Sequence, residues 1–295
     1  MTSDTTGAPT ATGGAPWPTG RPATAVGQPT HVAGESANKP HGARSSTPGS
    51  GSGAMVHAVL PELVAAADAF EEADESVLFP EELETISAAW EKRRREYTTV
   101  RACARQALAQ LGQPPVPLLS GKRNVPLWPT GVVGSMTHCD GYRAAAVAPA
   151  EAVRAMGIDA EPNLPLPEGV RESIALPREI AWIQAGERAA DVVQRGRLLF
   201  SAKESVYKTW YPLMGTELDF ADADITFTET ARHTATDPAG GVDVTGRFTA
   251  RLLRTPRPER PRPEQHPVPT TLTGHWVLGH GFLLTAITLP PQPTP

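Results

Sequence analysis

The chain has 295 residues, enough for one or two domains, and its 40% hydrophobic content is sufficient to build a core. A formal net charge of −5 gives it no general attraction for nucleic acid or for an anionic membrane. The sequence contains no run of about 18 apolar residues, so we expect no membrane-spanning helix. Its two cysteines, Cys103 and Cys139, lack the spacing of a metal or redox motif, which favours a reducing, cytoplasmic location.

Residues 1–54 consist mainly of Gly, Ala, Pro, Ser and Thr, with very few large apolar side chains. Such a segment buries too little surface to offset its ordering entropy, so we expect a disordered leader. It lacks the basic start and apolar stretch of a signal peptide. An inert tail or a wrongly assigned start codon, with the true start at Met55, explains it as well as any function does.

Two helices are predicted in the next segment. Pro80 begins the first, with acidic residues in its first turn, and the helix is expected to continue to Trp90. Residues 100–111 form the second, which Gly112 ends. The basic residues here are Lys92, Arg93, Arg94, Arg95, Arg101 and Arg105. They form either a solvated helix face or a phosphate site, because arginine binds phosphate with a planar, bidentate fork.

Residues 133–142, Val-Gly-Ser-Met-Thr-His-Cys-Asp-Gly-Tyr, predict a strand and a polar turn that lead into an alanine-rich strand, residues 142–148. We expect that strand to form a hairpin with residues 152–160. Small and hydroxyl-bearing residues let backbone amides approach a phosphate closely. His138 either donates to such a phosphate or is a turn histidine that binds a backbone carbonyl.

An acidic strand follows at residues 156–162. Because side chains alternate along a strand, Asp159 and Glu161 point to one face. Two carboxylates on one face repel each other unless a cation lies between them. Alone this is a weak signal, since a solvent-facing strand explains most such pairs.

A helix is predicted from Phe200 to Trp210, with Pro212 ending it. Glu204 and Lys208 are i,i+4 neighbours on it, and Lys203 lies about 100° away. An exposed pair of this kind contributes only about 0.3–0.5 kcal/mol. The chain has only five lysines, however, and three acids, Asp159, Glu161 and Glu204, would together form an oxygen site suited to Mg²⁺.

Short strands are predicted at residues 225–228, 242–253, 273–278 and 282–289, and Gly279–Gly281 turns the last hairpin. Residues 254–269, rich in arginine and proline, are expected to form a mobile loop. The fold class is therefore α+β, with two units of helices packed on antiparallel strands and a boundary near residues 149–153.

Gly157–Glu161, followed by Phe200–Lys208, resembles the signature of the 4′-phosphopantetheinyl transferases. Residues 133–142 are similar to the third motif of the Sfp/EntD-like, pseudo-dimeric branch, which serves polyketide and nonribosomal peptide synthases. The resemblance covers roughly residues 55–290. It implies two similar subdomains, 55–150 binding coenzyme A and 151–290 carrying the metal site and catalytic helix, with the active site between them.

The resemblance also implies the chemistry: transfer of the 4′-phosphopantetheine group from coenzyme A to a serine of an apo acyl or peptidyl carrier protein, releasing 3′,5′-ADP. Mg²⁺ is the expected metal, with Asp159, Glu161 and Glu204 as its ligands. Glu204 is the candidate base, and Lys203 and Lys208 would stabilise phosphate charge. The residues expected to bind coenzyme A are Arg93, Arg101, Lys122, Arg123, Thr137, His138, Asp159 and Lys208, with Arg94 an alternative to Arg93.

Two other classes stay open from the residues alone. A Mg²⁺-dependent phosphoesterase or nuclease would use the same carboxylates on another phosphate. A non-catalytic module that binds carrier proteins would need neither the metal nor all three acids. We expect a monomer that works in polyketide, nonribosomal peptide or siderophore synthesis and has no nucleic-acid or membrane partner.

Overall fold

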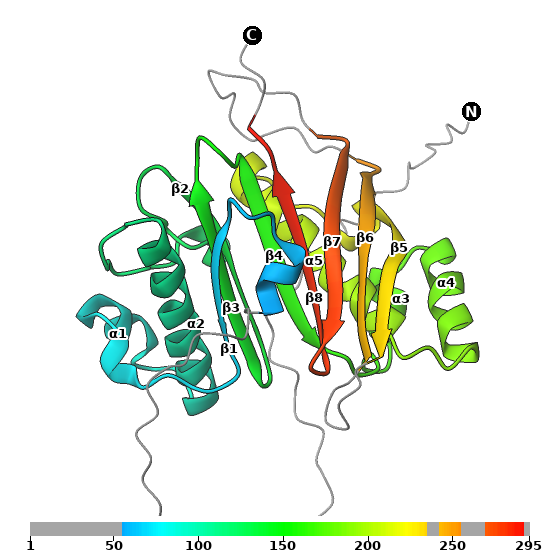
Figure 1. Cartoon of the computed structure of the whole chain (residues 1–295), viewed down its shortest axis with the longest axis horizontal. Helices are drawn as coiled ribbons and strands as arrows, with labels where there is room; N and C mark the ends of the chain where they lie inside the picture. Colours follow the sequence, from blue (N-terminus) through cyan, green and yellow to red (C-terminus); the bar gives the residue numbers. More distant parts are fainter. Residues whose placement is uncertain (1–54, 235–241, 255–268, 292–295) are drawn as a thin grey trace, which may run out of the picture.

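The computed structural model describes residues 55–234, 242–254 and 269–291 (Figure 1). The expectations for the leader, residues 1–54, and for most of the loop at residues 254–269 lie outside these ranges. None of the helices in the described part of the chain combines the length and apolar character needed to cross a bilayer.

The strands form two antiparallel sheets. A three-stranded sheet has the order β1-β3-β2, and a five-stranded sheet has the order β4-β8-β7-β6-β5. The strands are β1 (Ala65–Ala69), β2 (Val132–Cys139), β3 (Tyr142–Pro149), β4 (Ala155–Pro162), β5 (Ala223–Thr234), β6 (Val242–Leu252), β7 (Thr271–Gly279) and β8 (Phe282–Leu289). The α+β prediction is confirmed.

Helices pack on both sheets, and Figure 1 shows α1 and α2 at one end of the molecule, beside the smaller sheet, and α4 at the other. The helices are α1 (Pro80–Ile86), α2 (Glu91–Gln110), α3 (Val170–Ile174), α4 (Pro177–Arg188) and α5 (Arg195–Met214). Short 3-10 turns are η1 (Met55–Val59), η2 (Glu75–Val77), η3 (Lys122–Asn124) and η4 (Phe220–Asp222). Ala104 and Leu108 of α2 are buried on the small sheet, and Leu199 and Trp210 of α5 are buried against the large one.

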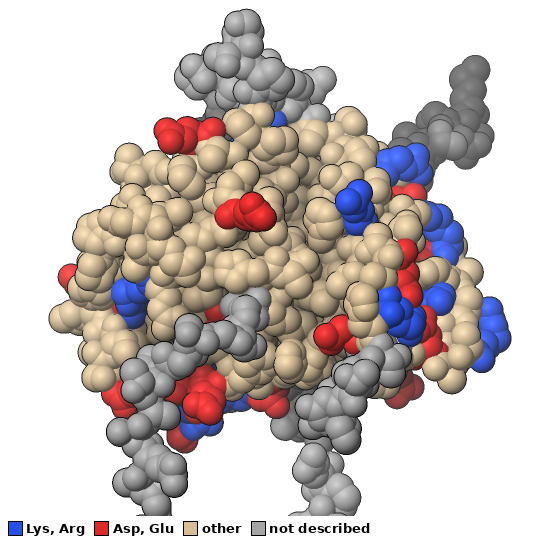
Figure 2. Space-filling view, viewed as in Figure 1, with Lys and Arg blue, Asp and Glu red and all other residues tan. Residues whose placement is uncertain are grey.

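The face seen in Figure 2 carries few charged side chains at its centre, over the strands. Basic and acidic side chains are mixed along the rim beside α4 and β5. Arg178 of α4 and Arg251 of β6 both form ion pairs with Asp224 of β5. Opposite charges are therefore paired between these elements.

Three sequence-based predictions of element boundaries were wrong. Strands β3 and β4 do not form a hairpin, because β3 already has β1 and β2 on its two edges and β4 pairs with β8. Helix α1 ends at Ile86, and Trp90 instead caps the start of α2. Pro212 lies within α5, where it removes one backbone donor in the last turn, and Gly215 ends the helix with a left-handed φ of 70°.

The two sheets meet where β2 lies beside β4. An edge strand leaves backbone N–H groups unpaired, and these need acceptors when they are buried. The N–H of Ile158 donates to Ser135 Oγ at 3.0 Å, and the N–H of Ala160 donates to Thr137 Oγ1 at 2.9 Å. Hydroxyl side chains therefore join the two sheets, and this contact places Thr137 next to Asp159.

Helix α5 lies directly on β4, and Gly157 makes this close approach possible. A Cβ atom at position 157 would lie 2.3 Å from the backbone oxygen of Ser205 and 2.5 Å from Thr209 Oγ1. Both are far inside van der Waals contact, so only glycine fits without moving the helix. Because Asp159 and Glu161 share the face of Gly157, the same approach brings both carboxylates onto α5.

Replacing Gly157 with alanine should therefore destabilise the fold by about 1–3 kcal/mol, the usual cost of overpacking, and should reduce activity by displacing α5. Urea unfolding curves measure the first effect. Gly279→Ala is the matched control, because a Cβ there would approach no atom closer than 3.3 Å. Equal stability of the two variants would show that the β4–α5 contact is not tight.

Candidate active site

Charged side chains of α5 and β4 face each other across this contact. Arg197, Glu204 and Lys208 are seven and four residues apart, so they lie along one face of the helix. Asp159 and Glu161 project from β4 toward that face, as the alternation of the strand predicts. The neighbouring residues of β4 at positions 158 and 160 are buried in the core on the other side.

Asp159 is the most enclosed of the three acids, with 5% of its surface exposed. Lys208 Nζ lies 2.6 Å from Asp159 Oδ1, and the Thr137 hydroxyl donates to the same oxygen at 3.3 Å. The other carboxylate oxygen, Oδ2, is buried and has no hydrogen-bond partner among the described residues. A buried carboxylate oxygen without a hydrogen-bond partner is a suitable place for a bound cation or for another hydrogen-bond donor.

The surroundings of the other two acids, Glu161 and Glu204, disfavour their ionised forms. Burial raises the pKa of Glu204 to about 8, with the charges of Asp159 and Glu161 adding to the effect and Lys208 opposing it. Burial and Asp159 raise the pKa of Glu161 to about 7, against the opposing charge of Arg197. The negative charges of the three acids therefore repel one another, and a divalent cation between them would relieve this repulsion.

The carboxylates are held by cations of the protein itself. Lys208 binds Asp159, and Arg197 NH1 lies 3.0 Å from Glu161 Oε2. No group of three or more His, Cys, Asp or Glu side chains in the described part of the chain is already arranged to hold a metal ion. The all-oxygen donor set and the orphaned Asp159 Oδ2 nonetheless fit a hard cation such as Mg²⁺, which keeps several waters and takes phosphate oxygens as its other ligands.

Lys208 stays positively charged at this site. Burial would lower the pKa of its ammonium group, but Asp159, Glu204 and Glu161 outweigh burial, and the pKa of Lys208 is raised. Its Nζ is also 3.5 Å from Thr137 Oγ1. A fixed ammonium beside a hydroxyl, reaching from one half of the protein to the other, is suited to binding a phosphate oxygen.

Lys203 lies elsewhere, and the prediction that it stabilises phosphate charge is wrong. Its side chain is completely buried, with Nζ 2.9 Å from Glu179 Oε2. The ammonium also donates to the carbonyl oxygens of Phe220 at 2.8 Å and Ala223 at 3.0 Å. The rotation of about 100° from Glu204 turns Lys203 toward α4 and the start of β5, where it links these elements to α5.

His138 lies at the end of β2 and contacts α2. Its Nε2 accepts a hydrogen bond from Arg93 NH1 at 2.9 Å, and its Nδ1 is 3.6 Å from Glu96 Oε2. Burial, followed by the charges of Arg93 and Lys208, lowers the pKa of His138 to about 3. The imidazole is therefore neutral, and these contacts differ from the carbonyl contact expected of a turn histidine.

Most of the basic cluster on α2 is paired with acids. Arg94 donates from two nitrogens to Glu75, and Arg95 pairs with Glu72 and Glu91. The remaining pairs are Lys92 with Asp140, Arg105 with Glu82 and, at the longer distance of 4.0 Å, Arg93 with Glu96. Arg93 differs from the others because it also contacts His138, at 2.9 Å. This placement favours Arg93 over Arg94 as the phosphate ligand.

Arg101, also on α2, is buried. Its guanidinium stacks 3.6 Å from the centre of the Tyr97 ring and donates to the Leu118 carbonyl oxygen and to Ser120 Oγ, both at 3.2 Å. Burial lowers the pKa of Arg101 to about 10. These contacts hold the segment after Leu118 against α2, and a contact of Arg101 with coenzyme A stays a prediction.

The turn after that segment, η3, contacts the residues that follow α5. Arg123 forms an ion pair with Glu217, which follows α5 in the chain. Arg123 and Asn124 adopt left-handed φ values of 60° and 59°, the conformation in which asparagine replaces glycine at low cost. Lys122 is exposed beside them. The turn thus closes over the end of α5, and the contacts of Lys122 and Arg123 with coenzyme A remain predictions.

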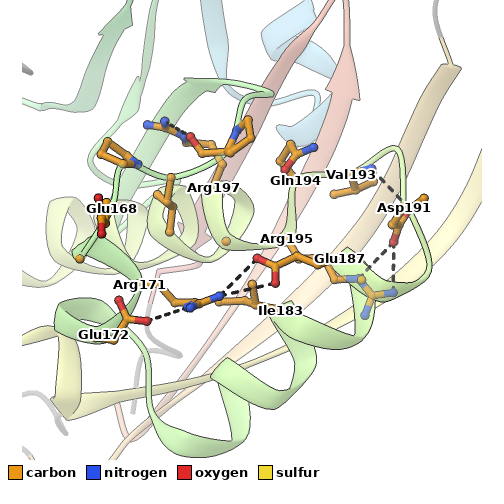
Figure 3. A pocket seen from close by; sticks show the side chains of 17 residues that line it. Glu168, Arg171, Glu172, Ile183, Glu187, Asp191, Val193, Gln194, Arg195 and Arg197 are labelled. Carbon is orange, nitrogen blue, oxygen red and sulfur yellow. Dashed lines mark hydrogen bonds and ion pairs between the residues drawn. The ribbon is translucent and has the colours of Figure 1, made fainter. Parts of the chain in front are cut away.

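A cavity of about 670 Å³ lies between α3, α4 and the start of α5 (Figure 3). Its arginines are already engaged, Arg171 with Glu187 and Arg195 with Asp191. Arg197 also lines it and is the link to the acidic site, through Glu161. Sequence reasoning missed Arg197, although its spacing from Glu204 and Lys208 marks the same helical face.

Two parts of the sequence match known protein-family models. Residues 80–148 match the 4′-phosphopantetheinyl transferase N-terminal domain, and residues 155–268 match the 4′-phosphopantetheinyl transferase superfamily.

Three relatives align with about four-fifths of the chain. The 4′-phosphopantetheinyl transferase Svp of Streptomyces mobaraensis is 46% identical over 243 residues, covering 79% of this chain and 88% of the relative. PptT of Mycobacterium tuberculosis is 44% identical over 80% of this chain and 99% of its own length. Npt of Nocardia iowensis is 42% identical over 79% and 99%. The chain therefore belongs to the 4′-phosphopantetheinyl transferase family and transfers the 4′-phosphopantetheine group of coenzyme A to carrier proteins.

Proposed function

We propose that the transfer takes place where α5 meets β4 and depends on Mg²⁺ held by Asp159, Glu161 and Glu204. The orphaned, buried Oδ2 of Asp159 is the observation that carries this assignment. Bound Mg²⁺ would neutralise charge on the diphosphate of coenzyme A. Two carboxylates whose pKa values are raised by burial and by neighbouring acids support a cation at this position.

Residues around the acids would bind and orient the diphosphate. Lys208 supplies a fixed positive charge, and Thr137 supplies a hydroxyl beside it. His138 is neutral, and because its Nε2 accepts from Arg93 its single N–H is on Nδ1, which would donate to a phosphate oxygen. Phosphoryl transfer needs mainly such positioning and charge stabilisation.

Glu204 is our proposed acceptor for the proton of the carrier-protein serine. The carboxylate lies on the same face of α5 as Arg197 and Lys208, which is the face that meets the acidic strand β4. Glu204 would thus take the proton directly or through a water.

At the other end of the site, Arg93 would bind the 3′-phosphate of coenzyme A, with Lys122 and Arg123 closing over the cofactor. The acceptors we propose are apo acyl and peptidyl carrier proteins of polyketide, nonribosomal peptide or siderophore synthesis. Because the site is assembled from both halves of one chain, a monomer is sufficient. The free thiols of Cys103 and Cys139 suit a reducing cytoplasm.

Glu204→Gln keeps the shape of the side chain but removes its charge and basicity. We expect weaker Mg²⁺ binding, because one ligand is lost, and a transfer rate lower by about 10²–10⁴-fold, the range for loss of a general base. Lys208→Ala should instead weaken coenzyme A binding more than metal binding, because an ammonium binds phosphate but cannot ligate a cation. Rates measured against Mg²⁺ and coenzyme A concentration separate the two.

Melting curves serve as the control for both variants. The Asp159–Lys208 pair is mostly buried, with 6% and 27% of the two side chains exposed, so Lys208→Ala leaves a buried carboxylate without its partner and should lower the melting temperature. The assignment of Glu204 is falsified if Glu204→Gln transfers at nearly the wild-type rate with an unchanged Mg²⁺ dependence.

Arg93→Ala and Arg94→Ala form a matched pair on neighbouring positions of α2. Loss of Arg93 should weaken coenzyme A binding by about 1–3 kcal/mol, the range for charge-assisted hydrogen bonds. It should matter much less for dephospho-coenzyme A, which lacks the 3′-phosphate. Arg94→Ala should leave both affinities unchanged, because Arg94 is committed to Glu75. Calorimetric titration measures the affinities, and equal losses on both ligands would place Arg93 elsewhere.

A further inference from the structure

Arg197, in the first turn of α5, uses every nitrogen of its guanidinium to hold the segment that follows the acidic strand. NH1 binds Glu161 Oε2 at 3.0 Å, Nε donates to the carbonyl oxygen of Leu164 at 3.2 Å, and NH2 donates to that of Pro165 at 2.8 Å. Its side chain is only 16% exposed. One residue thus fixes both the carboxylate and the backbone three to four positions beyond it.

Asn163 adds a second attachment in the same segment. Its Nδ2 donates to the carbonyl oxygen of Val192, and its Oδ1 accepts from the N–H of Gln194, both at 2.9 Å. Asn163 and Arg197 therefore bind the end of β4 to the start of α5 from two sides. Glu161 cannot rotate freely while these contacts hold.

We propose that Arg197 is a positioning residue for the metal site, holding Glu161 in the orientation in which it ligates the cation. This rests on the proposed Mg²⁺ function of Asp159, Glu161 and Glu204. Without a partner, Glu161 is buried beside Asp159 and repelled by it, so its carboxylate would turn away from the acids. Groups that orient metal ligands commonly contribute 10–100-fold to metal affinity, as an order of magnitude.

Two possible effects of Arg197 on metal affinity, its charge and its orientation of Glu161, predict opposite changes when Arg197 is removed. A positive charge near the site repels an incoming cation, so removing charge alone would tighten metal binding. Removing an orienting contact would weaken it. Arg197→Lys separates the two effects, because lysine keeps the charge but lacks the planar fork that reaches three acceptors at once.

Arg195 is a matched control two residues earlier in the same helix. It lines the same cavity, shown in Figure 3, and binds Asp191 and the carbonyl oxygen of Trp182. Within the described part of the chain, its hydrogen bonds and ion pair involve Asp191 and Trp182 rather than Asp159, Glu161 or Glu204. Arg195→Lys therefore changes an arginine of the same turn without touching the acids.

The experiment measures Mn²⁺ binding to the metal-free protein by electron paramagnetic resonance, without coenzyme A or carrier protein, alongside melting curves. We expect Mn²⁺ to bind about 10–100-fold more weakly to Arg197→Lys than to the wild type, and with unchanged affinity to Arg195→Lys. In transfer assays, the half-saturating Mg²⁺ concentration should rise for Arg197→Lys, while kcat at saturating Mg²⁺ stays near that of the wild type.

A second experiment tests chemical rescue, because Arg197 lines the cavity of about 670 Å³ and a small guanidinium compound can take the place of its side chain there. Added methylguanidinium should restore Mn²⁺ affinity to Arg197→Ala and not to Arg195→Ala. Wild-type affinity, or tighter binding, in Arg197→Lys would overturn the positioning role while leaving the metal site intact. A wild-type protein that binds no Mn²⁺ would overturn the metal assignment itself, and this proposal with it.

Discussion

The absence of a side chain at Gly157 is the constraint on which the site depends. It lets α5 rest on the backbone of β4, with a hypothetical Cβ only 2.3 Å from the Ser205 oxygen. The helix and strand run in opposite directions, because Lys208 meets Asp159 while Arg197 meets Glu161 farther along the strand. Charged groups from two elements, each regular by itself, therefore come together without any dedicated loop.

This arrangement places more negative charge in the interior than the protein compensates. The acids Asp159, Glu161 and Glu204 face Lys208 and Arg197, so the group carries one excess negative charge when every member is ionised. Burial, and after it the charge of Asp159, raises the pKa values of Glu161 and Glu204. In the proposed function, a divalent cation held by these acids would offset the excess negative charge.

Local periodicity explains what could be predicted from the sequence. Strand alternation placed Asp159 and Glu161 on one face, and helical spacing aligned Glu204 with Lys208. Lys203 was misassigned because spacing does not reveal which helix face is buried, and its partner Glu179 lies on another helix. The β3–β4 hairpin failed because pairing depends on which strand edges are free. Arg197 escaped notice because its acceptors become visible only in three dimensions.

The most direct test of the account is the intact mass of an apo carrier protein incubated with the enzyme, coenzyme A and Mg²⁺. The account predicts a mass gain of one phosphopantetheine group on the carrier serine, with one 3′,5′-ADP released per carrier and no reaction after chelation of the metal. Hydrolysis of coenzyme A without a carrier, or an unmodified carrier in the complete mixture, would contradict it.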